Sequence, residues 1–312
     1  MAGANLPAKK YTKTSPTQTR LSFECSGGAT QFIDIGLALS AANRKFARAG
    51  VYYYVNSVEI YNDETGVVDF HTAPDTWVTK NAWNRGFQLF QKMNAMVAPP
   101  ISNIGRPKYH DFKVYLDSRH KSTGSLLPSL HGINAAHTAL TADEWKYSEF
   151  VSADDDGDAN QQADNFFVHL LGGHVGNSND WESVGLVKSY GESRTTVTQE
   201  TPNDYPVVTT DPLMNVFDFS SEEQMNDIIE GLRDDNDRPP YSLTNYPGES
   251  TNSLHHVARI GTEVGVGRVG RASGFCAPFG LICIDPHGVS TPFRVVINLA
   301  VGTYHGVYAE RA

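Results

Sequence analysis

Cysteine is scarce in this chain: Cys25, Cys276 and Cys283 are the only three among 312 residues. An odd number of cysteines at these spacings fits neither a disulfide framework nor a zinc or thiol-redox motif. We therefore expect three buried thiols that behave as small apolar side chains. A chain without disulfides is typical of a protein that assembles in a reducing compartment.

Long apolar runs are also missing. No stretch approaches the roughly 18 apolar residues that a transmembrane helix needs, and the first twenty residues lack the hydrophobic segment of a secretory signal. We therefore expect a soluble protein with no membrane partner. With 40% hydrophobic and 19% charged residues, the composition is that of a globular chain rather than a disordered one.

Motifs for catalysis are the third absence. The sequence contains no HExxH zinc motif, no GxSxG nucleophile turn, no Walker loop and no kinase set. Gly265, Gly267 and Gly270 formally match a dinucleotide fingerprint, but the motif needs a helix directly after it. Gly274 and Pro278 follow instead, so no stable helix is expected there and the match fails.

Metal-binding patterns are equally weak. Residues 154–158 (DDDGD) resemble a calcium loop, but the glycine spacing, the twelfth-position glutamate and the flanking helices of an EF-hand are absent. A solvated acidic loop is the favoured interpretation. The eleven histidines are spread out, and neither His169 with His174 nor the adjacent His255 and His256 has the spacing of a ligand pair. We predict no catalytic residues, no metal site and no cofactor, and hence a protein that is not an enzyme.

Basic residues are concentrated at the start of the chain. The net charge is −10, but residues 1–50 hold seven basic and two acidic side chains, a net of +5, so the remaining residues carry −15. The first twenty residues contain no acid, and such an arm can contact phosphates. The candidate nucleic-acid-binding residues are Lys9, Lys10, Lys13, Arg20, Arg44, Lys45 and Arg48. An ordinary solvated terminus is the alternative.

Short extended segments dominate the rest of the chain. The predicted strands are residues 21–25, 31–39, 51–60, 67–72, 181–190, 194–200, 254–264, 280–285 and 293–303. Residues 67–72 follow a turn at 62–66 and are predicted to form a hairpin with 51–60. Residues 293–303 alternate most clearly, with the apolar side chains at 293, 295, 297, 299 and 301 on one face.

Two segments have helical periodicity instead, residues 79–97 and residues 220–232. Both lie between predicted strands and are interpreted as insertions. The expected fold is therefore all-β, a single jelly-roll β-sandwich with long loops and short helical insertions. Residues 1–18 are predicted to be a flexible basic arm, and residues 19–312 the jelly-roll domain. The tyrosines at 52–54 are assigned to the core, with a stacking platform for nucleic acid or sugar as the alternative.

Residues 39–46 (LSAANRKF), the tyrosine-rich segment, residues 74–77 (PDTW), residues 81–83 (NAW) and residues 302–307 (GTYHGV) resemble capsid proteins of small circular Rep-encoding single-stranded DNA viruses. The resemblance covers about a third of the chain. It implies a jelly-roll subunit that assembles into an icosahedral shell around single-stranded DNA. The family's arm is rich in arginine, whereas this arm has only Lys9, Lys10, Lys13 and Arg20, so the neutralisation of DNA by the arm is reduced.

These observations lead to one favoured function and two alternatives. We expect a self-assembling capsid protein, present in the virion and assembled inside the host cell, whose partners are identical subunits and packaged single-stranded nucleic acid. The first alternative is a β-sandwich module that binds carbohydrate or another ligand. The second is a hydrolase whose catalytic residues are far apart in sequence.

Overall fold

The computed structural model describes residues 17–97, 109–131, 137–152, 164–177, 180–193, 240–242, 246–249, 253–262 and 269–312. The chain divides into two compact units, one of residues 1–190 and 247–312 and the other of residues 191–246. All strands named below belong to the first unit, which is described by itself.

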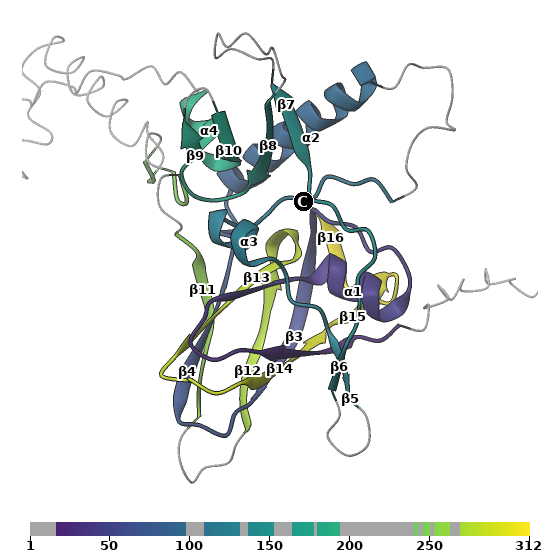
Figure 1. Ribbon diagram of the computed structural model, residues 1–312, viewed down its shortest axis with the longest axis vertical. Helices are drawn as coiled ribbons and strands as arrows, with labels where there is room; N and C mark the ends of the chain where they lie inside the picture. The colour runs from purple at the N-terminus through teal and green to yellow at the C-terminus, as the bar shows by residue number, and fades with distance from the viewer. Residues whose placement is uncertain are drawn as a thin grey trace, which may run out of the picture. The chain divides into compact units, whose positions relative to one another are not determined.

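Two antiparallel sheets form a β-sandwich (Figure 1). The first, called the β1 sheet, has the order β1 (Arg20–Cys25), β14 (Phe293–Leu299), β3 (Val51–Tyr61) and β12 (Val269–Ala277), and β16 (Ala309–Arg311) also pairs with β3. The second, called the β2 sheet, has the order β11 (His255–Thr262), β4 (Gly66–Thr72), β13 (Leu281–His287) and β2 (Gln31–Asp34). When the eight strands other than β16 are renumbered 1 to 8 in chain order, the two sheets have the orders 1-8-3-6 and 5-4-7-2. This is the jelly-roll arrangement, and the predicted fold class is confirmed.

The core lies between the two sheets and follows the period of two along each strand. Side chains that are at most 1% exposed come from both inner faces: Phe23, Val58, Ile60, Phe70, Ile284, Val295 and Ile297. Each side chain of this size stabilises the fold by about 1.5–3 kcal/mol when it leaves water. The predicted alternation in the last long strand is confirmed up to Leu299. It is wrong for Val301, which is 73% exposed because β14 ends and a new short strand, β15 (Val301–Tyr304), begins.

The predicted hairpin between residues 51–60 and 67–72 is wrong. Strand β3 pairs with β14 and β12, whereas β4 pairs with β11 and β13 in the other sheet. The turn between them crosses from one sheet to the other and is held by side chains. Asn62 bonds to the backbone of Glu64, and the carboxylate of Glu64 accepts hydrogen bonds from Ser290 and Thr291 at 2.8–3.0 Å. The turn is therefore bound to the loop between β13 and β14 instead of closing a hairpin.

The predicted strand at residues 31–39 is only half correct. Strand β2 ends at Asp34, and residues Ile35–Asn43 form helix α1. The Asp34 carboxylate accepts a hydrogen bond from the backbone N–H of Leu37 at 3.2 Å and caps the helix, while Arg44 ends it in the left-handed conformation (φ 52°). Leucine and alanine in this segment favour a helix as well as a buried strand, so alternation alone misled the interpretation.

A long insertion connects β4 to β11. Its described elements are α2 (Trp77–Val97), α3 (Ser118–Thr123), β5 (Ser129–His131), β6 (His137–Ala139), β7 (Glu149–Ser152), β8 (Asp164–His169), β9 (Val175–Asn177), β10 (Asp180–Gly185) and α4 (Leu186–Glu192). The helix predicted at 79–97 is confirmed as α2, and Trp83 packs it on Phe279 of the short turn before β13, with ring centroids 5.6 Å apart. In Figure 1, α2 and the small sheet β7-β8-β10-β9 lie at the end of the sandwich opposite the β3–β4 turn.

The strand predicted at 181–190 ends early. Strand β10 stops at Gly185, where an added Cβ would lie 2.2 Å from the carbonyl oxygen of Gly172, and α4 follows. Residues 1–16, 154–158, 194–200 and 220–232 lie outside the described residues, so the predictions made for them, including Lys9, Lys10 and Lys13, stay predictions.

Smaller expectations can also be followed in the structure. Cys25 and Cys283 are buried, Cys276 is half-buried, and all three are free thiols. Tyr53 is fully buried in the core and Tyr52 nearly so, which agrees with packing as their main role. In the part of the chain that the structure describes, no helix combines the length and apolar character required to span a membrane.

Candidate nucleic-acid interface

The start of β1 lies beside the end of α1. Gln18 exchanges two hydrogen bonds with the side chain of Asn43, at 2.7 and 3.2 Å, and the carbonyl of Thr19 accepts from the N–H of Leu299 at 2.9 Å. The hydroxyl of Thr17 donates to the carbonyl of His305. The last two residues of the predicted flexible arm, Thr17 and Gln18, are therefore hydrogen-bonded to the sandwich, and the arm leaves it next to α1.

Three predicted basic residues follow α1 directly and are exposed: Arg44, Lys45 and Arg48. Lys45 and Thr17 line the same small pocket, which places this basic turn against the root of the arm. Arg48 is directed elsewhere, because its guanidinium lies 3.8 Å from the carboxylate of Asp111, whose side chain is 7% exposed. The structure thus brings Arg44 and Lys45 together with the arm root, while Arg48 is partly neutralised.

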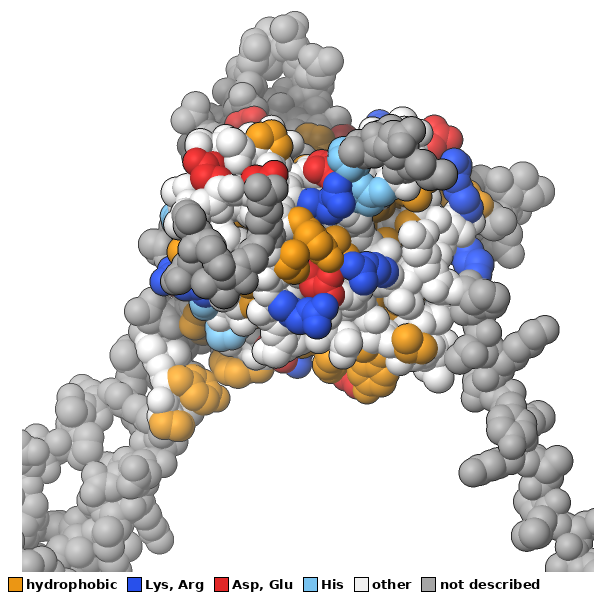
Figure 2. All heavy atoms as spheres, turned by 90° about the horizontal axis from the view of Figure 1, so that it is seen from below, with side chains coloured by type: hydrophobic (Ala, Val, Ile, Leu, Met, Phe, Trp, Pro, Cys, Tyr) orange, Lys and Arg blue, Asp and Glu red, His pale blue; other side chains and the backbone are white. Residues whose placement is uncertain are grey.

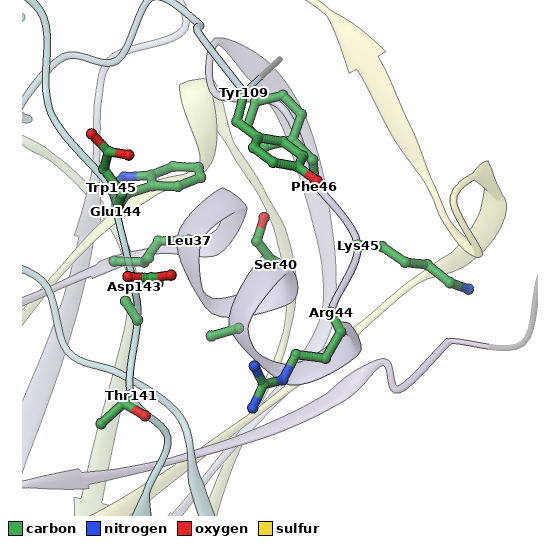
Figure 3. Close-up of a pocket in the computed structure, with 12 residues that line it drawn as sticks. Leu37, Ser40, Arg44, Lys45, Phe46, Tyr109, Thr141, Asp143, Glu144 and Trp145 are labelled. Atoms are coloured by element: carbon green, nitrogen blue, oxygen red, sulfur yellow. The ribbon is translucent and has the colours of Figure 1, made fainter. Parts of the chain in front are cut away.

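A pocket of about 210 Å³ opens between α1 and residues 141–145, and is called the α1 pocket (Figure 3). Its aromatic walls are Phe46, Tyr109 and Trp145. The ring of Phe46 lies 5.6 Å from that of Tyr109 and 6.2 Å from that of Trp145, tilted by about 50° to each. Figure 3 shows the guanidinium of Arg44 at one side of the pocket and the side chain of Lys45 pointing away from it.

A chain of partly and fully buried polar groups ends on Asp34, the residue that caps α1. The backbone N–H of Leu116 donates to Nδ1 of His120 at 3.0 Å, so Nε2 of His120 carries the proton and donates to Ser125 at 2.6 Å. Ser125 bonds to Tyr147 at 2.7 Å, and the Tyr147 hydroxyl donates to Asp34 at 3.2 Å. Burial raises the pKa of Asp34 to about 6, despite the hydrogen bonds that favour its charged form. The cap of α1 is therefore a carboxyl group that changes charge near neutral pH.

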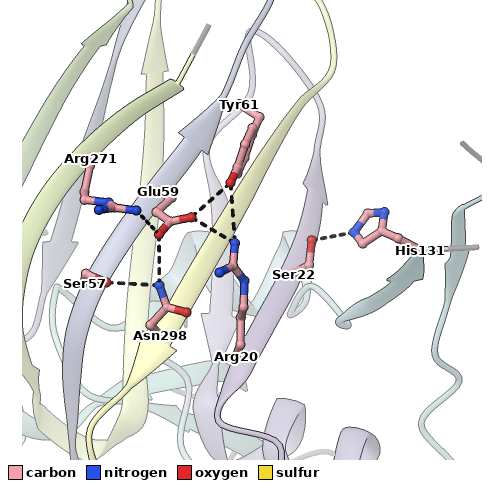
Figure 4. A network of polar contacts seen from close by, with 8 residues as sticks. All are labelled: Arg20, Ser22, Ser57, Glu59, Tyr61, His131, Arg271 and Asn298. Carbon is pink, nitrogen blue, oxygen red and sulfur yellow. Dashed lines mark hydrogen bonds and ion pairs between the residues drawn. The ribbon is translucent and has the colours of Figure 1, made fainter.

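Arg20 lies apart from the basic turn, on the outer face of the β1 sheet (Figure 4). There Arg20 donates a hydrogen bond to the buried carboxylate of Glu59 at 3.0 Å, and Arg271 donates to it at 2.7 Å. Tyr61 donates to the same carboxylate at 3.0 Å. Burial by itself would raise the pKa of Glu59, but the bonds from Tyr61 and Arg271 and the charge of Arg20 outweigh it and lower the pKa. Both guanidiniums remain largely exposed, 59% for Arg20 and 69% for Arg271, so they keep donors for an external anion.

A third arginine of the same face joins the hairpin β5–β6 to the sheet. Arg294 donates to Glu24 at 2.9 Å and to Nε2 of His137 at 3.2 Å. Because a guanidinium only donates, the proton of His137 lies on Nδ1 and is donated to Nδ1 of His131 at 2.6 Å. His131 in turn donates from Nε2 to Ser22 at 2.6 Å. Both rings must be neutral for all these bonds to form.

The same cluster is the one group of potential metal ligands in the described part of the chain. A carboxylate oxygen of Glu24 and ring nitrogens of His131 and His137 lie within 4.8 Å of one another. However, Arg294 already bonds to Glu24 and determines which nitrogen of His137 is protonated. An ion bound to Nδ1 of His137 would have to replace the proton there and break the hydrogen bond to His131. The geometry therefore favours hydrogen bonding over metal binding.

Figure 2 shows one face of the molecule, seen from below the view of Figure 1. Basic side chains surround a small hydrophobic and acidic group there, with histidine side chains close by. From the sequence, Arg20 is grouped with the basic residues at the start of the chain, and neither Arg271 nor Arg294 is assigned to an exposed sheet face. Their alternation with apolar core residues on β12 and β14 was the signal that could have assigned them to an exposed sheet face.

The outer face of the β2 sheet carries a second buried carboxylate. Asp69 accepts two hydrogen bonds from Arg259, both at 2.7 Å, and lies 3.2 Å from His256 and 3.4 Å from His287. The bonds from Arg259 lower the pKa of Asp69 to about 2, against the opposing effect of burial. This group was not predicted from the sequence.

A buried serine–histidine pair is the arrangement that comes nearest to the hydrolase alternative in the described residues. Ser183 Oγ lies 2.9 Å from Nδ1 of His169, and Nε2 of His169 donates to the carbonyl of Gly173 at 3.0 Å. Both side chains are fully buried, and the outer ring nitrogen faces a carbonyl where a triad has a carboxylate. Burial lowers the pKa of His169 to about 4. The pair lacks the access and the third member that nucleophilic catalysis needs.

Comparison with known protein families, with curated proteins and with solved structures finds no match to this chain. The resemblance to viral capsid proteins therefore stays a prediction from the sequence, and function has to be argued from the geometry described above.

Proposed function

We propose that this chain is a capsid subunit that self-assembles into a closed shell around single-stranded nucleic acid. The observation that carries the proposal is the jelly-roll order of the eight longer strands in the two sheets, an architecture used by viral capsid proteins as well as by lectins and cupins. Such a sandwich is a rigid body, and its long insertion offers additional surface for contacts between neighbouring copies.

The distribution of basic groups supports the nucleic-acid part of the proposal. The arm that contains Lys9, Lys10 and Lys13 leaves the sandwich beside Arg44 and Lys45, and Arg20 begins the strand that follows it. The exposed side chains of Arg44 and Lys45 thus lie at the point where the predicted arm begins. A nucleic acid held there would contact the arm and the basic turn at the same time.

Electron microscopy of the purified protein tests assembly. We expect uniform closed particles over a range of salt and pH, with co-purified nucleic acid visible in the ratio of absorbance at 260 and 280 nm. A protein that stays monomeric at high concentration under all these conditions contradicts the proposal.

Removal of the arm tests packaging separately. The deletion should stop at residue 16, because Thr17, Gln18 and Thr19 are hydrogen-bonded to the sandwich. We expect particles of unchanged fold that contain less nucleic acid and bind it with a weaker dependence on salt. Unchanged nucleic-acid content would assign packaging to the sandwich alone.

A β-sandwich module that binds carbohydrate is the second candidate, and the α1 pocket favours it. Aromatic rings beside carboxylates, here Trp145 with Asp143 and Glu144, can hold a sugar ring by stacking and by hydrogen bonds to its hydroxyls. Binding to a glycan array by a protein that forms no particles would replace the capsid proposal with this one.

A further inference from the structure

We infer that the α1 pocket accepts a single nucleobase with an exocyclic amino group, from a strand whose backbone runs along the basic turn after α1. The inference rests on the proposed function, because it assigns the pocket to the nucleic acid that the shell would enclose. It adds a chemical preference that packaging by a charged arm alone would not have.

The size and walls of the pocket fit one base. Its volume of about 210 Å³ is smaller than the sites that hold drug-sized ligands, yet it is large enough for one planar heterocycle. Phe46, Tyr109 and Trp145 contribute aromatic rings to its lining. Stacking on such rings is available to every base and contributes to binding without selecting a sequence.

The polar groups at the pocket determine which bases it prefers. Figure 3 shows the carboxylate of Asp143 directed into the pocket and the guanidinium of Arg44 near its mouth. A carboxylate accepts hydrogen bonds and repels phosphate, so Asp143 suits the amino group of cytosine or adenine. Thymine presents a carbonyl oxygen at that position. Arg44 can contact the phosphate that stays outside.

The surroundings of the pocket favour a nucleotide over a neutral sugar. A neutral sugar could use the aromatic rings and Asp143 and could accept a hydrogen bond from Arg44. It would gain no charge attraction from Arg44, from Lys45 or from the basic residues of the predicted arm. A nucleic acid strand would use all of these groups. The buried ammonium of Lys113 lies 4.3 Å from the ring centroid of Trp145 and holds that ring by a cation–π contact.

Short fluorescent homopolymers of dC and dT, added at pH 7.5 to the purified full-length protein, test the inference by anisotropy. We expect dC to bind about fivefold more tightly than dT, because one charged hydrogen bond separates them. Tyr109→Ala, at a side chain 55% exposed, should weaken both about tenfold through lost stacking. Asp143→Ala should remove the preference for dC without weakening the binding of dT.

Two further variants separate charge from folding. Arg44→Asn should weaken dC and dT equally, since asparagine tolerates the left-handed conformation of this position. Lys92→Ala removes one exposed charge from α2 and should leave both affinities unchanged. Thermal unfolding midpoints within a few degrees of the parent protein show that each variant is folded.

The outcomes distinguish this inference from the proposed function. Equal binding of dC and dT by the parent protein, or binding that Tyr109→Ala leaves unchanged, overturns the base pocket while particles seen by microscopy still support the capsid. Competition for the pocket by a monosaccharide, with no effect of Arg44→Asn, also overturns it and supports a carbohydrate site. A dC preference that depends on Asp143 supports the pocket whether or not particles form.

Discussion

The outer faces of the two sheets hold a buried carboxylate in the same way but surround it with different cations. Glu59 of the β1 sheet is 4% exposed and lies between Arg20 and Arg271. Asp69 of the β2 sheet is 3% exposed and lies beside one arginine and two histidines. Arginine keeps its charge at every physiological pH. The carboxylate of the β1 sheet therefore has two permanent positive charges beside it, and the carboxylate of the β2 sheet has one.

Removing the carboxylate of the β1 sheet should have the largest effect on stability. Glu59→Gln leaves two arginines close together without the anion that both contact, and we expect a loss of about 2 kcal/mol in the free energy of unfolding. Urea denaturation followed by fluorescence measures it. The loss should be equal at pH 8 and pH 5.5, and a strong dependence on pH would contradict the assignment.

The equivalent change on the other face should cost less. Asp69→Asn removes the pair with Arg259, and we expect a loss of about 1 kcal/mol in the free energy of unfolding at pH 8. The pKa of Asp69 is lowered to about 2, so the stability contributed by its charged form is present above the ordinary range of an aspartate and is lost as the pH falls to about 2. The cost of the substitution should therefore be the same at pH 8 and pH 5.5 and should decrease below about pH 4, measured by the same denaturation series. A cost as large as that of Glu59→Gln would remove the distinction between the faces.

The two faces should also differ in how much one arginine contributes to the salt dependence of nucleic-acid binding, which is a smaller effect than those on stability. Arg271→Gln leaves Glu59 with Arg20 and Tyr61, and we expect the slope of log affinity against log salt to fall by about 0.7, the value of one phosphate on a single strand. Arg259→Gln is the matched control, because it also removes one exposed arginine from a buried carboxylate. Equal effects of the two variants would show that neither face is preferred.

The smallest predicted effect concerns the hairpin β5–β6. Burial and then the charge of Arg294 lower the pKa of His131. A second proton on the ring of His131 would also break its hydrogen bond with His137. Histidine NMR titration should find His131 below the ordinary range. Arg294→Ala should raise its pKa, since the charge of the arginine is lost and Glu24 is freed to stabilise the protonated ring. An unchanged titration would contradict the deduced order of donors.

Much of the sandwich could be predicted from local pattern because its strands alternate, as β14 does from Phe293 to Leu299. Pairing could not be predicted, since the period of two is the same whether β4 joins β3 or the opposite sheet. Helix α1 was missed for a related reason: Ile35, Leu37 and Leu39 are buried in a helix as they would be in a strand.

The candidate site was only partly predictable. Charge composition pointed to Arg20, Arg44 and Lys45, and the structure brings the last two to the root of the arm. Arg271 and Arg294 come from strands more than 200 residues away from Arg20 in sequence, so no local pattern joins them. The α1 pocket likewise depends on a contact between residues 44–46 and 141–145 that exists only after folding.

The position of the insertion has a consequence for how such a protein can change. Thr72, the last residue of β4, and His255, the first of β11, are direct partners in the β2 sheet. Residues 73–254 therefore form one insertion, and the strand pairing of β4 with β11 holds its two ends side by side. The entropy of closing such a loop grows only slowly with its length. Segments can be lengthened, shortened or exchanged there while the eight strands keep their register, so one jelly roll can acquire new outer surfaces without a new core.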